Sequence, residues 1–117
     1  MNDLKFERRP WGTYEVLYDG EECKVKKIIV DPGQSPSYQY HHKRSESWTV
    51  VSGEGECTID DTPRSVKCGD TITVPVGVKH TIMNTSDSVP LVFIEVQTGS
   101  YFGEDDIVRL KDKYGRA

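Results

Sequence analysis

The stretch that decides the fold is residues 37–52, SYQYHHKRSESWTVVS. Its first half alternates, so that Gln39, His41 and Lys43 fall on one face of a strand of period 2. Its second half, Ser47–Ser52, reads as another strand, ended by a glycine-containing turn. Two short strands that follow each other so closely are typical of an antiparallel β-structure.

The rest of the chain continues this pattern. Val, Ile and Thr number 13, 7 and 9, against 4 Leu and a single Ala, which favours strands over helices. Further strands are expected at Thr13–Tyr18, Cys23–Val30, Glu56–Asp60, Arg64–Lys67, Thr71–Val74, His80–Asn84 and Leu91–Gln97. Only Glu104–Tyr114 has acids at its start, apolar residues at i, i+3 and i+7, and basic residues at its end, as a helix has. The sequence therefore predicts an all-β fold, a small antiparallel barrel or jelly roll with a short C-terminal helix.

Length and charge exclude several classes of protein. A chain of 117 residues predicts one domain, residues 1–117. The net charge of −4 argues against a nucleic-acid-binding protein, and no apolar run reaches the ~18 residues that span a membrane. The first ten residues show no signal peptide, and three cysteines without CxxC spacing predict a reducing cytoplasm rather than a disulfide framework.

Two spaced motifs carry the candidate chemistry. Residues 33–53 read G-x5-Q-x-H-x4-E-x6-G, and residues 69–84 read G-x5-P-x-G-x2-H-x3-N. These resemble the two motifs of the cupin superfamily, a family of small β-barrels, with Gln in place of the usual first His. A metal ion needs side chains that converge on one point, and four residues meet that requirement: Gln39, His41, Glu46 and His80. This mixed nitrogen and oxygen set suits Zn²⁺, and also Mn²⁺, Co²⁺ or Fe²⁺. Gln39 is also open to a second interpretation, a hydrogen bond within the barrel.

A narrower resemblance covers almost the whole chain, from about Arg9 to Arg116. It rests on four segments: RPWG at 9–12, SYQYHHKRSESW at 37–48, EVQTGSYFGEDDIVR at 95–109 and YGR at 114–116. They look like the C-terminal cupin domain of the type II mannose-6-phosphate isomerase family, which is often fused to a mannose-1-phosphate guanylyltransferase. Two departures stand out, since Lys43 and Ser47 replace two histidines of the family's motif.

The resemblance implies a metal-dependent isomerase that interconverts mannose 6-phosphate and fructose 6-phosphate, in the supply of GDP-mannose. Such a reaction needs a base, a group that stabilises an oxyanion and residues that bind the phosphate group. Glu95 is the expected base, because its apolar strand neighbours would raise its pKa. Arg44 and Arg109 are expected in catalysis, and the expected substrate-binding residues are Arg44, Lys43, Arg109 and Arg116.

Two other functions stay open. The first is a metal-containing cupin that binds a sugar or sugar phosphate without turnover, because Lys43 and Ser47 have disabled the chemistry. The second is another metal cupin enzyme, such as a dioxygenase, which would need a redox-active iron. A small sugar phosphate is the expected partner if the chain is the isomerase or the non-catalytic binding cupin. A homodimer is expected through an exposed edge strand.

Overall fold

The computed structural model describes residues 5–112 and residue 115. The described residues form strands and no helix, so none of their segments is a helix that could cross a membrane. The strands are β1 (Lys5–Arg9), β2 (Gly12–Asp19), β3 (Lys24–Val30), β4 (Tyr38–Tyr40), β5 (Arg44–Ser52), β6 (Glu54–Ile59), β7 (Thr62–Lys67), β8 (Thr71–Val74), β9 (His80–Asn84), β10 (Leu91–Gly99) and β11 (Val108–Lys111). The expected all-β fold is confirmed.

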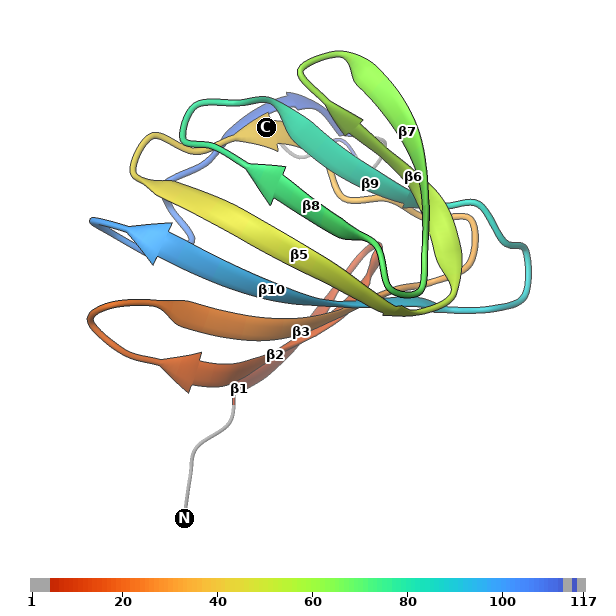
Figure 1. Cartoon of the computed structure of the whole chain (residues 1–117), viewed down its shortest axis with the longest axis horizontal. Helices are drawn as coiled ribbons and strands as arrows, with labels where there is room; N and C mark the ends of the chain where they lie inside the picture. Colours follow the sequence, from red (N-terminus) through yellow and green to blue (C-terminus); the bar gives the residue numbers. More distant parts are fainter. Residues whose placement is uncertain (1–4, 113–114, 116–117) are drawn as a thin grey trace.

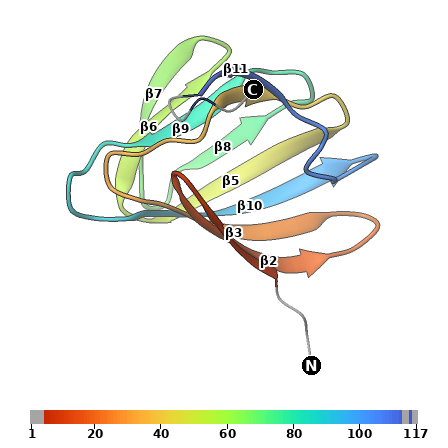
Figure 2. The ribbon, with the colours of Figure 1, turned by 180° about the vertical axis from the view of Figure 1, so that it is seen from behind.

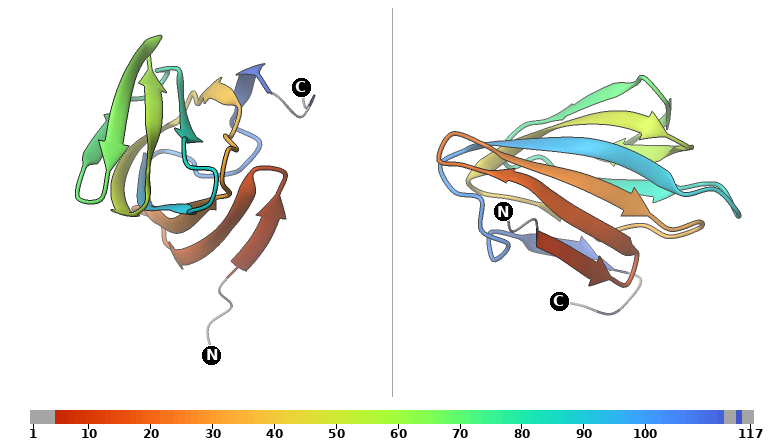
Figure 3. Two further views of the ribbon diagram at one scale, coloured as in Figure 1. Left: turned by 90° about the vertical axis from the view of Figure 1, so that its right-hand side faces the viewer. Right: turned by 90° about the horizontal axis from the view of Figure 1, so that it is seen from below.

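The strands make two antiparallel sheets. One sheet has the order β1-β2-β3-β10-β5-β8, and the other has the order β11-β4-β9-β6-β7 (Figure 1). The opposite view shows β11 and β4 lying across from the β3–β10–β5 face (Figure 2). Seen from the side, the sheets curve around a common interior (Figure 3).

The interior is filled by alternate residues of each strand. On β3 the buried positions recur every second residue from Lys24 to Val30, and β10 and β5 show the same alternation. The core is rich in β-branched and aromatic side chains, which suit a pleated surface. It comprises Trp11, Tyr14, Val16, Ile28, Val30, Trp48, Val50, Cys57, Val66, Ile72, Val74, Ile82, Leu91 and Phe93.

The short C-terminal helix is not formed, so that expectation is wrong. Residues 104–106 make a turn, and β11 then pairs antiparallel with β4, with Arg109 opposite Gln39. An isolated helix of about eleven residues is marginal in water. Pairing with β4 instead satisfies the backbone of a segment that carries the β-branched Val108. Residues 113–114 and 116, where the predicted helix and the YGR motif end, lie outside the described residues.

The sequence also missed the first strand. β1 is polar and mostly exposed, so it carries no hydrophobic alternation that would predict a strand. It forms because β2 offers an edge, and the two strands pair from Lys5↔Val16 to Arg9↔Gly12. This pairing brings Arg9 beside the interior of the barrel.

Candidate metal centre and its cavity

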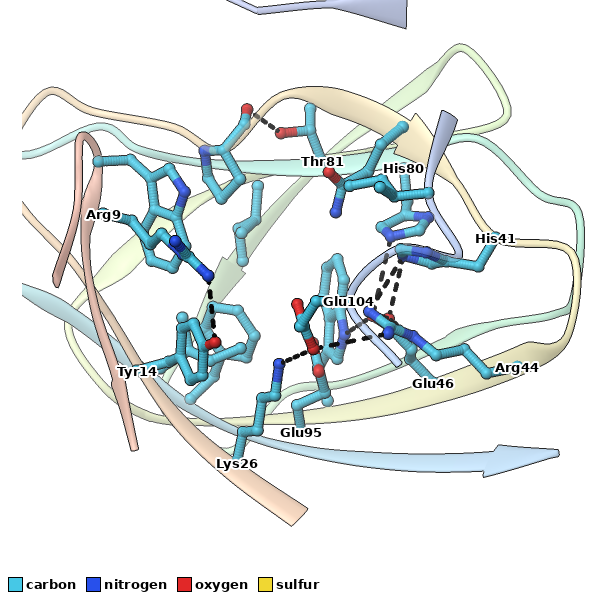
Figure 4. Close-up of a pocket in the computed structure, with 18 of the residues that line it drawn as sticks. Arg9, Tyr14, Lys26, His41, Arg44, Glu46, His80, Thr81, Glu95 and Glu104 are labelled. Atoms are coloured by element: carbon cyan, nitrogen blue, oxygen red, sulfur yellow. Dashed lines mark hydrogen bonds and ion pairs between the residues drawn. The ribbon is translucent and has the colours of Figure 1, made fainter. Parts of the chain in front are cut away.

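A cavity of about 170 Å³ opens into the interior between the two sheets (Figure 4). Its apolar lining includes Trp11, Ile28, Trp48, Ile82 and Phe93. Its polar lining includes Arg9, Tyr14, Lys26, Gln39, His41, Arg44, Glu46, His80, Glu95, Glu104 and Arg109. So many ionisable groups in one small cavity mark it as the candidate functional site.

Three predicted metal ligands meet at one end of this cavity. His41 follows β4, Glu46 lies on β5 and His80 begins β9, and all three are buried. Their possible ligand atoms all lie within 4.8 Å of one another. Two atoms bound to one zinc ion at ~2.0–2.2 Å are at most about 4.4 Å apart, so only small movements would be needed. The structure therefore brings together a set of groups that could hold a metal ion.

Hydrogen bonds at Nδ1 orient the rings of His41 and His80 so that their Nε2 lone pairs point to where the possible ligand atoms converge. His41 Nδ1 lies 2.6 Å from the Asp106 carbonyl oxygen, and His80 Nδ1 lies 3.0 Å from the Val78 carbonyl oxygen. A carbonyl oxygen only accepts, so each Nδ1 donates and each neutral ring presents an unprotonated Nε2. Within the described part of the chain, His80 Nε2 is buried without a hydrogen-bond partner, and it lies 3.7 Å from Glu46 Oε1. Two lone pairs and a carboxylate that face one another fit a cation between them.

Glu46 is ionised despite its burial. Desolvation opposes the charge, but the polar groups around the carboxylate, among which Arg44 carries a permanent positive charge, hold the pKa of Glu46 well below its usual range. Trp48 Nε1 donates to Glu46 Oε1 at 2.9 Å, which fixes the carboxylate toward the histidines. Burial also lowers the pKa of His80, which keeps that ring in the neutral form that ligates metals.

Arg44 shares this end of the cavity. Its Nε and Nη2 both donate to Glu46 Oε2 at 2.9 Å, and its Nη2 lies 3.3 Å from His41 Nε2. The guanidinium thus supplies part of the positive charge that Glu46 and His41 face. A metal ion would share or take over these contacts, and Arg44 is well placed to act on any ligand bound beside it.

The other predicted site residues fall into two groups. Gln39 on β4, Glu95 on β10 and Arg109 on β11 line the cavity. Gln39 stands opposite His80 in the register, although its Oε1 accepts a hydrogen bond from Ser37 Oγ at 2.7 Å. Its role as a fourth ligand stays a prediction. Arg116 lies outside the described residues.

Glu95 has the environment expected of it. Burial, together with the negative charge of Glu46, raises the pKa of Glu95 to about 8. Gln97 Nε2 donates to its carboxylate at 2.6 Å. Glu95 and Glu46 therefore differ in protonation at neutral pH although both are buried in one cavity.

Lys43 does not share the inward face, so that expectation is wrong. β4 ends at Tyr40, and the alternation that placed Lys43 beside His41 stops in the turn that follows. Lys43 is exposed, and its Nζ lies 5.2 Å from the centre of the Tyr101 ring. It is not among the residues that line the cavity.

Sequence reasoning missed Asp106. Its carboxylate accepts hydrogen bonds from the backbone N–H groups of His42 and Lys43, both at 2.9 Å, while its carbonyl accepts from His41. Desolvation opposes its charge, but those backbone donors lower its pKa. Asp106 thus orients His41 from a segment 65 residues away in the sequence. Only the GEDDIVR segment marked this region, and its acids suggested a helix start instead.

Sequence reasoning also missed the two inward-facing lysines of β3. Lys24 and Lys26 share the inward face of β3 with Ile28 and Val30, and Lys26 is buried. Lys26 Nζ lies 4.1 Å from the centre of the Tyr14 ring and 2.6 Å from Glu104 Oε2. Two lysines on an otherwise apolar strand face were the signal that could have identified this site.

A family model matches this chain: mannose-6-phosphate isomerase C-terminal, over residues 4–112. The chain belongs to this family. Its relatives include the mannose-1-phosphate guanylyltransferase 2 of Escherichia coli O157:H7, which is 44% identical over 91% of the chain. The xanthan biosynthesis protein XanB of Xanthomonas campestris is 47% identical and the alginate biosynthesis protein AlgA of Pseudomonas aeruginosa 45%, each over 92% of the chain. The chain spans only 22–23% of the length of these three relatives.

These relatives overturn the prediction that the chain is a mannose-6-phosphate isomerase. Their names describe guanylyl transfer and polysaccharide biosynthesis, and the family match identifies a C-terminal cupin domain, not an isomerase activity. The resemblance misled because the matching segments identify the domain, and a domain does not fix a reaction. What holds is that the relatives are enzymes of the mannose-phosphate pathway and of polysaccharide biosynthesis.

Solved structures confirm the cupin fold. A Klebsiella pneumoniae protein with a double-stranded β-helix domain superposes with a TM-score of 0.72 at 24% identity, covering 84% of this chain and 83% of that one. The oxalate decarboxylase of Bacillus subtilis superposes with a TM-score of 0.80 at 19% identity, covering 92% of this chain and 30% of that one. At these identities the likeness shows the fold alone.

Proposed function

We propose that the chain is a metal-binding cupin domain that binds a phosphorylated hexose in its cavity, as part of mannose-phosphate metabolism. The observation that carries the proposal is the convergence of His41, Glu46 and His80 within 4.8 Å at one end of a cavity that also holds Lys26 and Arg44. A metal ion binds hydroxyl or carbonyl oxygens, and lysine and arginine bind phosphate.

The metal is proposed to be Zn²⁺, with Mn²⁺, Co²⁺ and Fe²⁺ as alternatives. Two imidazoles and one carboxylate form a set that zinc sites use when they leave a position open for a further ligand. Gln39 Oε1 is proposed to complete the set, since Gln39 faces His80 across β4 and β9. Bound there, the ion would supply positive charge beside the ligand's oxygens.

The phosphorylated hexose is proposed from charge and from the relatives. The cavity is lined by four cationic side chains from different strands: Arg9, Lys26, Arg44 and Arg109. A phosphate group accepts charge-assisted hydrogen bonds from lysine and arginine side chains, and a neutral sugar offers no such charged acceptor. The relatives that carry the name mannose-1-phosphate guanylyltransferase point to mannose phosphates as the first ligands to try.

Calorimetric titration of the zinc-loaded chain with mannose 1-phosphate, mannose 6-phosphate and mannose tests the proposal. At least one phosphate ester should bind, and mannose should bind at least about tenfold more weakly, because its charge-assisted hydrogen bonds are missing. His80→Ala should lose the metal and bind the phosphate ester more weakly, because the contacts of the metal with the ligand are lost. The matched control is His42→Ala, since His42 is the exposed neighbour of His41. Equal binding of mannose and its phosphates, or no binding by a metal-loaded chain, would refute the proposal.

A homodimer stays a prediction. Among the described strands, β1 and β8 end one sheet, and β11 and β7 end the other. Sedimentation of the purified chain over a range of concentrations would check it.

A further inference from the structure

Three cationic side chains surround a single oxygen atom at the mouth of the cavity. Glu104 Oε2 lies 2.6 Å from Lys26 Nζ, 3.9 Å from Arg44 Nη1 and 4.0 Å from Lys24 Nζ. The close-up shows Glu104 between Lys26 and Arg44 (Figure 4). This oxygen occupies the point at which the positive charges of β3 and β5 converge.

The cations and the anion are held very differently. The side chains of Lys24, Lys26 and Arg44 are 11%, 4% and 5% exposed and lie on strands. The Glu104 side chain is 43% exposed and belongs to the turn between β10 and β11. The positive charges thus lie on paired strands, whereas the negative charge comes from a turn residue that takes part in no strand pairing.

Glu104 leaves part of this donor set unused. Arg44 Nη1 is buried and has no hydrogen-bond partner among the residues that the structure describes. Lys24 Nζ donates to the Phe102 carbonyl oxygen at the long distance of 3.5 Å. A carboxylate has two oxygens, whereas a phosphate monoester has three terminal oxygens in a tetrahedral arrangement, so a phosphate could serve donors that Glu104 does not reach. Buried donors without partners are costly, which favours an occupant that satisfies them.

We propose that Lys26, Arg44 and Lys24 form an anion subsite that Glu104 occupies until the phosphate group of a ligand displaces it. The inference rests on the proposed function for the class of ligand and adds how that ligand is admitted. Glu104 acts as an internal competitor that neutralises the buried cations of the empty cavity. Ligand affinity is then reduced by the fraction of molecules in which Glu104 holds the subsite.

Inorganic phosphate is the probe, titrated calorimetrically into the metal-free full chain at constant ionic strength. Glu104→Gln removes the competing charge and should tighten phosphate binding about tenfold, as for a subsite that is open one-tenth of the time. The matched control is Asp105→Asn, which removes the same charge from the next residue. Asp105 is exposed and accepts a hydrogen bond from Tyr101 Oη, away from the subsite, so this variant should change the affinity less than about twofold. Lys26→Met should weaken phosphate binding at least about tenfold, because it removes the amine nearest the subsite.

Glu104→Ala gives a second test of the same competition, since it removes the carboxylate without leaving an amide to hydrogen-bond Lys26. It should tighten phosphate binding as Glu104→Gln does. If both Glu104 variants bind phosphate no more tightly than Asp105→Asn, the inference is wrong, whatever sugar phosphates do. If both tighten binding but the zinc-loaded chain still binds no mannose phosphate, the subsite stands and the proposed function fails.

Discussion

The two ends of the cavity are built in different ways. The metal end takes His41 and Glu46 from one stretch of 16 residues and adds His80 from a second motif. The anion end combines Lys26 from β3 with Glu104 from the turn before β11, and Arg44 from β5 lies between the two ends, in contact with both Glu46 and Glu104. Spacing along the sequence predicted the first end and gave no sign of the second. A spacing motif identifies residues that a local strand and turn bring together. It does not identify residues that become neighbours only when distant strands pair.

The largest expected effect distinguishes the metal end of the cavity from the anion end. His80→Ala should weaken Zn²⁺ binding by more than about 100-fold, beyond the 10–100-fold range for residues that only orient ligands. It should leave phosphate binding to the metal-free chain within about twofold, because no Lys or Arg contact is removed. Competition with a chromophoric chelator measures the metal affinity, and His42→Ala is the control. Equal losses in the two variants would show that His80 is not a ligand.

Asp106→Ala should weaken Zn²⁺ binding by about 10–100-fold, since Asp106 fixes the turn that carries His41. The nitrogen NMR shifts of His41 give a readout that general destabilisation would not mimic. They should report a proton on Nδ1 in the wild type and a mixture of tautomers in the variant. Asp106→Asn keeps one acceptor oxygen and should recover part of the affinity. A wild-type His41 protonated only at Nε2 would contradict this account.

Glu95→Gln should remove a fall in stability as pH rises. Burial raises the pKa of Glu95 from 4.5 to about 8, so the stability that Glu95 contributes is present below pH 4.5 and is lost as pH rises through 8. At ~1.4 kcal/mol per pKa unit, the loss is at most a few kcal/mol. Urea unfolding of the metal-free chain between pH 5 and pH 9 measures it.

The control for this pH series is Glu56→Gln, an exposed glutamate on β6, which should keep the wild-type slope. A Glu95→Gln chain whose stability falls over this range as steeply as the wild type would show that Glu95 is ionised at neutral pH.

The smallest expected effect concerns Lys43. It was predicted to bind substrate, but it is exposed and does not line the cavity. Lys43→Ala should therefore change phosphate affinity less than about twofold, since an exposed charge is screened by salt. The same titration that shows a large loss for Lys26→Met provides the comparison. A loss for Lys43→Ala as large as that for Lys26→Met would move the anion subsite to the turn after β4.

Local patterning predicted most of the strands and three clustered ligands. Alternation gave the core faces of β3, β5 and β10, because a strand repeats every second residue whatever it pairs with. Alternation failed at Lys43, where the strand ends and the period no longer applies. It also failed at β1 and β11, whose polar or mixed sequences become strands only because β2 and β4 offer them edges.

The sequence by itself determined the β-rich interior, the family and the spacing that brings His41, Glu46 and His80 to one point. These follow from side-chain preferences and from residues that are close in the chain or fixed by motif spacing. Only the tertiary structure decided that residues 108–111 form a strand, that Asp106 orients His41, and that Lys26 meets Glu104 across 78 residues. The physical reason is that the energies of edge pairing and of buried charge compensation depend on which distant segments become neighbours, and local sequence does not encode that.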